Sequence, residues 1–355
     1  MSLLQQTIDA IEPQSQEYRK LAEERILDLT MPRWALGRLL DLAVDLAGMT
    51  RSLHPQVRQK NIVLMAGDHA IIAEGVSDQP KEVTLQMIYN FIRRGAGINV
   101  LAANAGAGVT VVDMGVDGCL QDLVDAGKII SKKIAYGANN FARGPAMTRE
   151  QAIASLEAGI EVAKMLSPST DIFGTGEMGI GNTTPSSAII AVLTGTKDIA
   201  SVVDRGAGLP SAKLPLKVDA IRRGIELNQP DPADGIDVLH KIGGYEIGGI
   251  AGLILGAAAL KKPVVVDGFI STAGALIAHS LCPASADYMI AAHGSMERGH
   301  QPMLKLLNKK PLLDLSLRLG EGTGAALAMN IVDAAVAVMT EMATFSSAGV
   351  TDKGL

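Results

Sequence analysis

The sequence is poor in residues on which several classes of protein depend. Only two of its 355 residues are cysteines, Cys119 and Cys282, too few for a disulfide framework or a cysteine metal cluster, so we expect a reducing compartment. A Walker A motif, a G-x-S-x-G nucleophile elbow and an H-E-x-x-H zinc motif are absent from the chain. We therefore expect neither a P-loop nucleotide site, nor a serine nucleophile, nor a bound metal.

A large excess of charge is also lacking. The formal net charge is −5 and no basic cluster stands out, which argues against nucleic acid or an anionic membrane as a partner. The first ten residues lack the basic and apolar segments of a secretory signal. The longest apolar run, Ile247 to Leu260, is shorter than the roughly 20 residues of a membrane span. We expect a cytoplasmic protein in which that run forms a buried helix.

What the chain does contain is typical of a parallel α/β sheet. Hydrophobic residues make up 48% of the chain and glycines number 38, whereas aromatics make up 3%, a composition suited to helices packed closely over a sheet. Short apolar runs predict strands and longer periodic runs predict helices. The predicted strands span residues 62–66, 109–112, 170–173, 199–203, 263–266 and 287–292, and the predicted helices span 82–104, 148–166, 183–194, 213–227, 246–260 and 271–280.

Both ends of the chain have a helical pattern instead. Apolar residues recur at helical spacing between Leu3 and Met49, and again from Leu304 to Leu307 and in the Ala-rich stretch from Gly324 to Thr340. No strand pattern interrupts these stretches. We expect the two ends to pack together as a smaller helical domain.

A polar residue, in most cases followed closely by glycine, ends nearly every predicted strand. Because the carboxyl ends of parallel strands share one edge of the sheet, and ligands bind at that edge, we expect these side chains to surround a binding site. The residues are Asp68, Asp113, Glu177, Asp204, Asp267 and His293.

The segment from Asp171 to Ala188 joins a short strand to a helix through a run of glycines. Backbone N–H groups at such a junction can approach an anion without Cβ clashes, and residues 182–184 add cap oxygens and hydroxyls, so the segment predicts a phosphate site. Gly174, Gly176 and Gly179 also fit the G-x-G-x-x-G dinucleotide pattern, but the acidic residue expected at a strand end about 20 positions later is missing. A turn that needs glycine only for tightness is the third interpretation.

Glu321 stands between two glycines just before the long Ala-rich helix. A carboxylate in this position can cap the helix N-terminus. It can equally serve as a general base, because Gly320 and Gly322 let a ligand come close. A ribosyl phosphate held by the glycine run and a carboxylate that accepts a proton would together suit transfer of a sugar phosphate to a heterocyclic nitrogen.

Six segments of the chain, taken together, form a recognisable family pattern. They are Gly67–Ser77, Pro80–Met87, Gly144–Thr148, Gly174–Thr184, Asp267–Thr272 and Leu319–Gly324. In order and residue type they resemble the nicotinate-nucleotide–dimethylbenzimidazole phosphoribosyltransferase family, and the resemblance runs from about Pro32 to Met342. The chain departs from the family pattern at Trp34, Gln79, Gly294 and Arg298.

The resemblance implies a doubly wound, mainly parallel Rossmann-like sheet with a smaller helical domain from both chain ends, assembled as a homodimer. The implied boundaries are residues 1–55 for an N-terminal arm of the small domain, 56–298 for the large domain and 299–355 for the C-terminal part of the small domain. The implied reaction moves the ribose 5-phosphate of nicotinate mononucleotide to 5,6-dimethylbenzimidazole with inversion. Its products are nicotinate and α-ribazole 5′-phosphate, a precursor of the lower ligand of cobalamin, and no cofactor is needed.

The resemblance also implies the site residues. The catalytic base falls on Glu321. Contacts to phosphate, ribose and nicotinate fall on Gly176, Glu177, Gly179, Asn182, Thr183, Arg205, Gly206, Gly208, Lys217, Ser271, Gly294 and Ser295. The walls of the base pocket fall on Ser77, Gln86, Met87 and Leu319.

Three alternatives stay open at this point. One is a homologue that activates another lower-ligand base, such as a purine, a phenol or a hydroxybenzimidazole. A second is a transferase that uses phosphoribosyl pyrophosphate and Mg²⁺, although that class displays paired acidic residues where Asp204 is followed by Arg205. A third is an NAD-binding protein without transferase activity, suggested by the G-x-G-x-x-G match alone.

Overall fold

A parallel sheet forms the centre of the computed structural model, which describes residues 1–206 and 208–351. Its strands, within the described residues, are β1 (Lys60–Gly67), β2 (Ala107–Gly115), β3 (Ile130–Ser131), β4 (Ile172–Met178), β5 (Val264–Val266) and β6 (Met289–Ala291). They lie in the order β3-β2-β1-β4-β5-β6, and every neighbouring pair is parallel. This is the order of a doubly wound sheet whose direction of winding reverses between β1 and β4, so the predicted fold class is confirmed.

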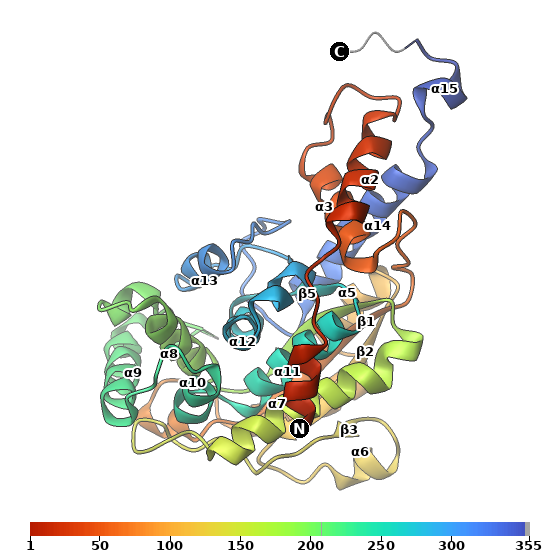
Figure 1. Cartoon of the computed structure of the whole chain (residues 1–355). Helices are drawn as coiled ribbons and strands as arrows, with labels where there is room; N and C mark the ends of the chain where they lie inside the picture. The colour runs from red at the N-terminus through yellow and green to blue at the C-terminus, as the bar shows by residue number, and fades with distance from the viewer. Residues whose placement is uncertain (207, 352–355) are drawn as a thin grey trace.

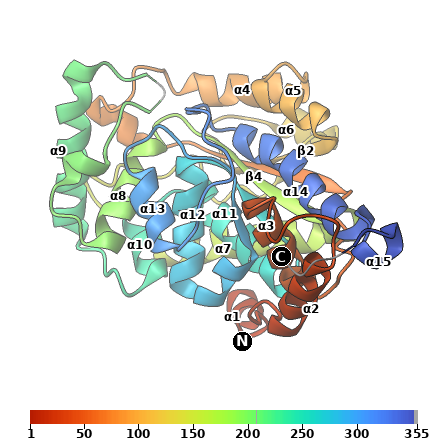
Figure 2. The same ribbon diagram turned by 90° about the horizontal axis from the view of Figure 1, so that it is seen from above.

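Helices cover both faces of the sheet (Figure 2). α11 and α12 pack on one face, with α7 against α11, while α4, α5 and α14 lie on the other. The helices are α1 (Leu3–Asp9), α2 (Gln16–Leu27), α3 (Arg38–Thr50), α4 (Glu82–Ile92), α5 (Gly97–Asn104), α6 (Gln121–Asp125), α7 (Arg149–Leu166), α8 (Thr183–Thr194), α9 (Leu214–Asn228), α10 (Gly235–Ile242), α11 (Tyr245–Ala259), α12 (Phe269–Leu281), α13 (His300–Leu306), α14 (Thr323–Glu341) and α15 (Phe345–Ala348). The sheet is therefore enclosed, which explains why its strands are apolar runs without alternation.

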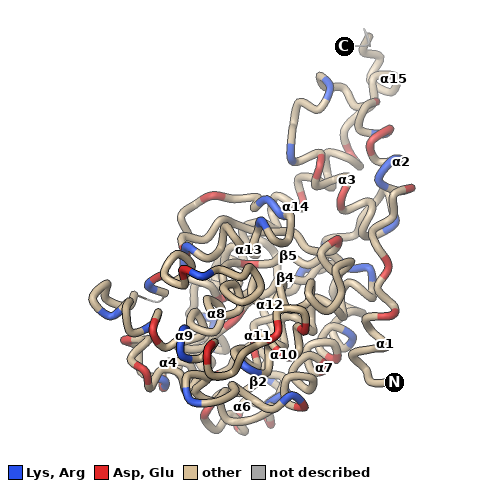
Figure 3. The backbone as a smooth tube through the Cα atoms, turned by 60° about the vertical axis from the view of Figure 1, so that its left-hand side comes forward, with Lys and Arg blue, Asp and Glu red and all other residues tan. Residues whose placement is uncertain are grey.

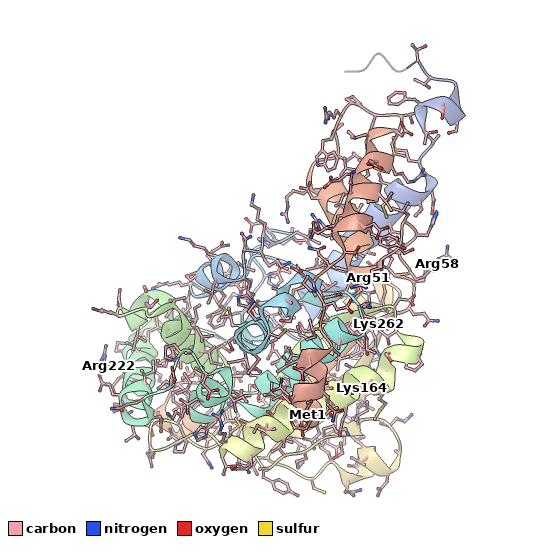
Figure 4. All side chains as sticks on the ribbon, viewed as in Figure 1. Met1, Arg51, Arg58, Lys164, Arg222 and Lys262 are labelled. Carbon is pink, nitrogen blue, oxygen red and sulfur yellow. The ribbon has the colours of Figure 1, made fainter. Side chains whose placement is uncertain are left out.

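The two ends of the chain meet in a helical projection above the sheet (Figure 1). α2, α3, α14 and α15 form it, and Leu29 pairs with Thr344 in an isolated antiparallel bridge. The Arg25 side chain also donates to the carbonyl of Met339, 2.7 Å away. α1 behaves differently, because it packs against α7 and α11 beside the sheet, where Figure 4 places Met1. The boundaries at residues 55 and 298 stay a proposal, and residues 352–355 of the last segment lie outside the described residues.

The long apolar helices differ in how they are buried. In α11 the side chains from Tyr245 to Ala258 are all buried, so the helix predicted over residues 246–260 is a core element. α14 is the one helix of the described residues that is long and apolar enough to cross a membrane, but half of its apolar window is buried and it packs on α3, α5 and β4. Core helices pass the same test of length and hydropathy, so α14 is weak support for a membrane span. Basic and acidic residues are interspersed along the whole backbone (Figure 3).

Two predicted elements are wrong. The single helix over residues 82–104 is two helices, because Arg94 has a φ of +62° and Gly95 follows it, which ends α4 and lets α5 start at a new angle. The strand over residues 199–203 is a short 3-10 helix, Ile199–Val202, in which both the backbone N–H and the hydroxyl of Ser201 donate to the carbonyl of Asp198. β3, α6, α10 and α15 were not predicted.

Candidate active site

A cavity of about 250 Å³ opens at the carboxyl ends of β4, β5 and β6. This is the edge at which the strand-end residues were expected to meet, beside the point where the winding reverses. The described residues that line it are Gln79, Val83, Met87, Glu177, Met178, Gly179, Ile180, Asn182, Thr183, Gly206, Asp267, Gly268, Phe269, Ile270, Ser271, His293, Ser295, Glu297, Arg318, Leu319, Gly320 and Glu321. Segments far apart in the sequence thus build one site.

The glycine run is placed differently from the prediction. Gly174 and Gly176 lie inside β4 rather than in the turn that follows it. A Cβ atom at Gly174 would lie 2.3 Å from the side chain of Ile62, and one at Gly176 would lie 2.5 Å from the carbonyl oxygen of Glu321. These two glycines are therefore needed because neighbouring groups pack directly on the strand, and the dinucleotide pattern has no structural counterpart here.

The turn after β4 leads directly into the N-terminus of α8. No side chain caps this helix end, and the Asn182 amide nitrogen donates to Glu177 Oε2. Gly179, Asn182 and Thr183 of this junction line the cavity. At the start of this helix the Thr184 N–H donates to the carbonyl of Gly181 and Pro185 has no N–H, so the Thr183 N–H and the helix dipole are what favour a bound anion here.

Lys217 supplies a positive charge behind this junction. The side chain of this α9 residue is fully buried, and its Nζ donates to Thr183 Oγ1 at 2.8 Å and to the carbonyl oxygen of Asp204 at 3.0 Å. Burial lowers the pKa of Lys217 to about 8, although the nearby Glu297 and Asp204 act to raise it. A buried lysine held by neutral oxygens is still an effective partner for an anion, because little water screens it.

Asp267 fixes the loop that carries Glu321. It ends β5, and its Oδ1 accepts hydrogen bonds from the backbone N–H groups of Gly324 at 2.7 Å and Ala325 at 3.0 Å, while its Oδ2 accepts one from Gly322 at 3.1 Å. The carboxylate therefore caps the N-terminus of α14, although it lies more than fifty residues earlier in the chain. Through this cap the sheet determines where the helix and its preceding loop begin.

Glu321 itself has an unusual backbone. Its φ is +62°, between Gly320 at +83° and Gly322 at +94°, and a non-glycine residue in this region costs about 1–3 kcal/mol unless its surroundings hold it there. Its backbone N–H donates to Glu177 Oε1 at 3.3 Å, and its Oε2 accepts from the backbone N–H of Ile98 at 3.2 Å, at the start of α5. The loop is thus held by three separate parts of the fold.

The carboxyl group of Glu321 is set up to accept a proton. Its residue is 7% exposed, and burial raises its pKa, with a further upward contribution from Asp267, while the Ile98 amide acts to lower it. A carboxylate with a raised pKa is a stronger base than one in water. The hydrogen bond from the Ile98 backbone N–H occupies Oε2, which is one of the two oxygens of the Glu321 carboxylate.

Glu177 is the second carboxyl group of the cavity. Burial raises its pKa to about 8; the Asn182 amide acts to lower it, and Asp267 and Glu246 raise it further. It is therefore mainly protonated at neutral pH. A neutral Glu177 can share hydrogen bonds with its neighbours without adding a second negative charge beside Glu321.

The structure brings most of the expected site residues together. Of that set, Glu321, Glu177, Gly179, Asn182, Thr183, Gly206, Ser271, Ser295, Met87 and Leu319 line the cavity. Lys217 lies directly behind Thr183, and Gly176 lies behind the Glu321 backbone. The others do not line it. Ser77 and Arg205 line a small neighbouring pocket that shares Gly179, Asn182 and Thr183 with the cavity, Gln86 is exposed, the Gly294 backbone N–H bonds to Leu313, and nothing lies within 4 Å of a Cβ atom added at Gly208.

Other lining residues were not named as site residues. Asp267 and His293 were expected only at the sheet edge, and their strand-end position was the signal that could have identified them. Glu297 and Arg318 lie in irregular segments, where no periodic pattern marks a side chain as facing a cavity. Val83 and Phe269 carry no chemical signature that would separate a wall residue from the core.

Comparison with known proteins identifies the family. A family model described as phosphoribosyltransferase, DBI_PRT, matches residues 11–350. The chain belongs to this family. It is 60% identical over 352 residues to the nicotinate-nucleotide–dimethylbenzimidazole phosphoribosyltransferase of Syntrophotalea carbinolica, and 53% identical over 353 residues to that of Geobacter sulfurreducens, with 99% of each chain covered in both cases.

Solved structures of the phosphoribosyltransferase family agree with this assignment. The crystal structure of CobT from Thermus thermophilus matches with a TM-score of 0.89 and 41% sequence identity, covering 94% of this chain and 99% of that one. The resemblance noted in the sequence is therefore confirmed. The NAD-binding interpretation is wrong, because the family is one of transferases and the glycines on which that interpretation depended pack inside β4.

Proposed function

We propose that this chain transfers the ribose 5-phosphate of nicotinate mononucleotide to 5,6-dimethylbenzimidazole, giving α-ribazole 5′-phosphate and nicotinate. The names of its relatives support this reaction, as does membership of the phosphoribosyltransferase family. The observation that carries the proposal is the position of Glu321, whose buried carboxylate lines the same cavity as Asn182 and Thr183 at the N-terminus of α8, where no side chain caps the helix. One end of the cavity suits an anion and the other suits a base that receives a proton.

The phosphate group would bind at the start of α8. Thr183, Gly206 and Ser295 line this end of the cavity, and Lys217 donates to Thr183 from behind. The Thr183 backbone N–H and hydroxyl would donate to phosphate oxygens while the helix dipole favours their charge. Among the other expected contacts, Gly179 and Ser271 lie in the same wall, and Arg205 lines the neighbouring pocket that shares Gly179, Asn182 and Thr183 with the cavity. Contacts from Gly208 and Gly294 would require their loops to shift.

Glu321 would act as the general base. One ring nitrogen of the benzimidazole attacks C1′ of the ribose, the bond from C1′ to the nicotinate nitrogen breaks, and the proton on the other ring nitrogen passes to the Glu321 carboxylate. Attack from the face opposite nicotinate inverts C1′ from β to α. Proton acceptance of this kind contributes about 10²–10⁴ in rate, and fixed binding of both substrates contributes proximity.

The chemistry of the substrates makes few other demands on the protein. Nicotinate leaves from a positively charged pyridinium nitrogen, so its departure needs no general acid. Pyrophosphate does not depart, so the reaction as written needs no metal ion to bind a leaving diphosphate. We therefore propose that the reaction proceeds in the presence of EDTA.

An apolar wall would hold the benzimidazole ring near Glu321. Met87 and Val83 from α4 and Leu319 from the loop before α14 line the cavity on this side. Leu319 is 60% exposed without a ligand, and an acceptor ring would cover part of that surface. Ser77 and Gln86, which the family resemblance also assigns to this pocket, lie outside the cavity wall. Contact by Ser77 would require movement of the segment between β1 and α4, and contact by Gln86 would require movement of α4 itself.

We further propose that the chain works in the cytoplasm as a homodimer with the two-domain division given above. Its expected freedom from cofactors, nucleic acid and membranes belongs to the same proposal. Light scattering coupled to size-exclusion chromatography tests the dimer directly, since a monomer of 37.0 kDa is well separated from twice that mass. A monomeric mass at assay concentration would remove the dimer from the proposal and leave the reaction untouched.

The central experiment measures nicotinate and α-ribazole 5′-phosphate together by chromatography and mass spectrometry. Purified protein is incubated with nicotinate mononucleotide in the presence and absence of dimethylbenzimidazole. We expect equal amounts of the two products, and no nicotinate without the base. Nicotinate release that does not depend on the base would indicate a hydrolase or glycohydrolase instead.

A further inference from the structure

Glu297 is a buried carboxylate to which the proposed reaction assigns no role. It lies in the segment between β6 and α13, is 7% exposed, and lines the cavity beside Thr183 and Gly206. Its Oε2 atom is buried without a hydrogen-bond partner among the described residues. Leaving a carboxylate oxygen buried and unbonded is costly, so such an atom points to a partner that arrives with a ligand.

The groups around Glu297 come from several elements. Three charged side chains act on it electrostatically: Lys217 from α9, Asp204 from the loop before α9 and Arg318 from the loop before α14. The backbone amide of Gly206 acts on it as well. Burial raises its pKa most strongly; Lys217, Gly206 and Arg318 act to lower it, and Asp204 acts to raise it. Glu297 is therefore easier to protonate than an exposed glutamate.

The cation and the carboxylate at this end of the cavity do not touch. Within the described residues the Lys217 Nζ bonds to a hydroxyl and a carbonyl oxygen rather than to a carboxylate. Its ammonium has three hydrogens and these two bonds use two of them. An anion seated against Thr183 and Gly206 would thus have Lys217 behind Thr183 and Glu297 in the cavity wall beside it.

We propose that Glu297 is a phosphate-binding residue that takes up a proton when the phosphate group of the substrate enters the cavity. The proton comes from solvent, no other bond changes, and the protonated carboxyl then donates through its otherwise unbonded oxygen to a phosphate oxygen. While it is ionised, Glu297 repels the phosphate dianion. This inference rests on the proposed function, because it concerns the substrate of the same site.

The sign of the pH effect follows from linkage. The bound dianion raises the pKa of Glu297 above its value in the free protein. At any pH between the pKa of the free protein and that of the complex, binding is therefore accompanied by proton uptake. In that interval affinity for the anion falls by up to about tenfold for each pH unit of increase. Lys217, whose pKa is about 8, starts to lose its charge at higher pH, so measurements should stay below about pH 7.5.

Sulfate is the probe, because any proton taken up when sulfate binds must be taken up by the protein. It has the shape and charge of a phosphate dianion, but it does not titrate between about pH 5 and 9. Its dissociation constant is measured by calorimetry at three values between about pH 6 and 7.5, in two buffers of different ionisation enthalpy. For the wild type we expect weaker binding as pH rises, with up to one proton taken up per sulfate.

Glu297→Gln removes the titrating group and keeps its shape. We expect sulfate binding that changes less than twofold across the same range and is several-fold tighter than wild type at about pH 7.5. Glu226→Gln is the matched control, because it removes the same charge from an exposed position on α9, the helix that carries Lys217. It should keep the pH dependence of the wild type.

Two results would overturn the inference. If Glu297→Gln keeps the wild-type slope, the proton belongs to another group; if it weakens sulfate tenfold at every pH, Glu297 is needed as an acceptor and does not oppose the anion. Should the variant fail to fold, as shown by circular dichroism, the proton count of the wild type still decides, since zero uptake rules the inference out. Sulfate binding requires no turnover, so a failure of the proposed reaction would show separately as absence of nicotinate release.

Discussion

The backbone N–H of Glu321 donates to Oε1 of Glu177 across 3.3 Å, so the position of one carboxyl group of the cavity depends on the other. Glu177 in turn receives the amide of Asn182, at the start of α8. A chain of contacts therefore links the proposed base to the proposed phosphate end. Because burial raises the pKa of Glu177 to about 8, the link is made at neutral pH by a largely uncharged group that leaves the charge of Glu321 undisturbed.

The first prediction concerns the proposed base. Glu321→Gln removes proton acceptance but keeps the size of the side chain and its ability to accept from Ile98. We expect kcat to fall by about 10²–10⁴, with KM for nicotinate mononucleotide within threefold of wild type, because the phosphate end is untouched. Steady-state kinetics with both products quantified provide the measurement.

Glu341→Gln is the control for that variant. It removes the same charge from the opposite end of α14, where the side chain is exposed. Its kcat should match that of the wild type. Wild-type turnover in Glu321→Gln would show that another group accepts the proton, whatever the family relationship.

The second prediction concerns the cap that positions this loop. The two carboxylate oxygens of Asp267 accept hydrogen bonds from the backbone N–H groups of Gly322, Gly324 and Ala325. Asp267→Asn leaves only one oxygen that can accept, and it removes the charge. We expect a loss of about 1–3 kcal/mol in the free energy of unfolding, together with a lower kcat, because hydrogen bonds to a charged group are lost and the loop relaxes. Urea denaturation measures the first effect. Asp9→Asn, at the exposed end of α1, should change neither quantity.

The sequence was most informative where burial leaves a continuous pattern. β1 was predicted because Ile62 to Ala66 is an unbroken apolar run, and the structure shows all five side chains fully buried. Helix 82–104 was wrong because its apolar spacing continues through the break at Arg94, where a left-handed backbone changes the direction without changing the pattern. Periodicity reports which face is buried, and it does not report a change of axis.

The site was harder to predict than the sheet, because its contacts join distant segments. Glu321 could be singled out from its flanking glycines, but the cap that holds it comes from Asp267, and no local signal connects the two. Gly176 illustrates a second limit. A glycine that lets an anion approach and a glycine against which the backbone of Glu321 packs are identical in sequence, and only the fold distinguishes them.

The third prediction concerns pH and stability through Glu177. Its pKa in the folded chain is about 8, above the ordinary value of 4.5, so the folded chain holds a proton that the unfolded chain has already released between these values. Stability is therefore greatest below the lower value and declines as pH rises through about 8. We expect Glu177→Gln to remove part of this decline, on the order of a few kcal/mol between about pH 5 and 9.

Thermal denaturation at five pH values measures this difference. The melting temperature of the wild type should fall more steeply with pH than that of Glu177→Gln, and the two curves should separate most above about pH 8. Glu23→Gln, an exposed position on α2, should follow the wild type. Parallel curves for wild type and Glu177→Gln would mean that Glu177 is ionised in the folded protein at neutral pH.

The last prediction tests whether Gly176 acts by packing. A Cβ atom at this position would lie 2.5 Å from the carbonyl oxygen of Glu321 and 3.0 Å from its carbonyl carbon, both of which are backbone atoms that cannot rotate away. In Gly176→Ala the loop must therefore move off the sheet. We expect a loss of about 1–3 kcal/mol in the free energy of unfolding, and a fall in kcat of at least tenfold because Glu321 moves with its backbone.

Gly144→Ala is the matched control, because nothing lies within 4 Å of the added Cβ atom. It should leave the free energy of unfolding close to that of the wild type and kcat within twofold of it. Gly176→Ala could instead keep its stability and its kcat but have a higher KM for nicotinate mononucleotide. That result would mean that the glycine is needed to let the substrate come close, and that the Glu321 loop can accommodate a Cβ atom at residue 176. A joint loss of stability and kcat supports close packing of the two backbones as the reason for glycine in this strand.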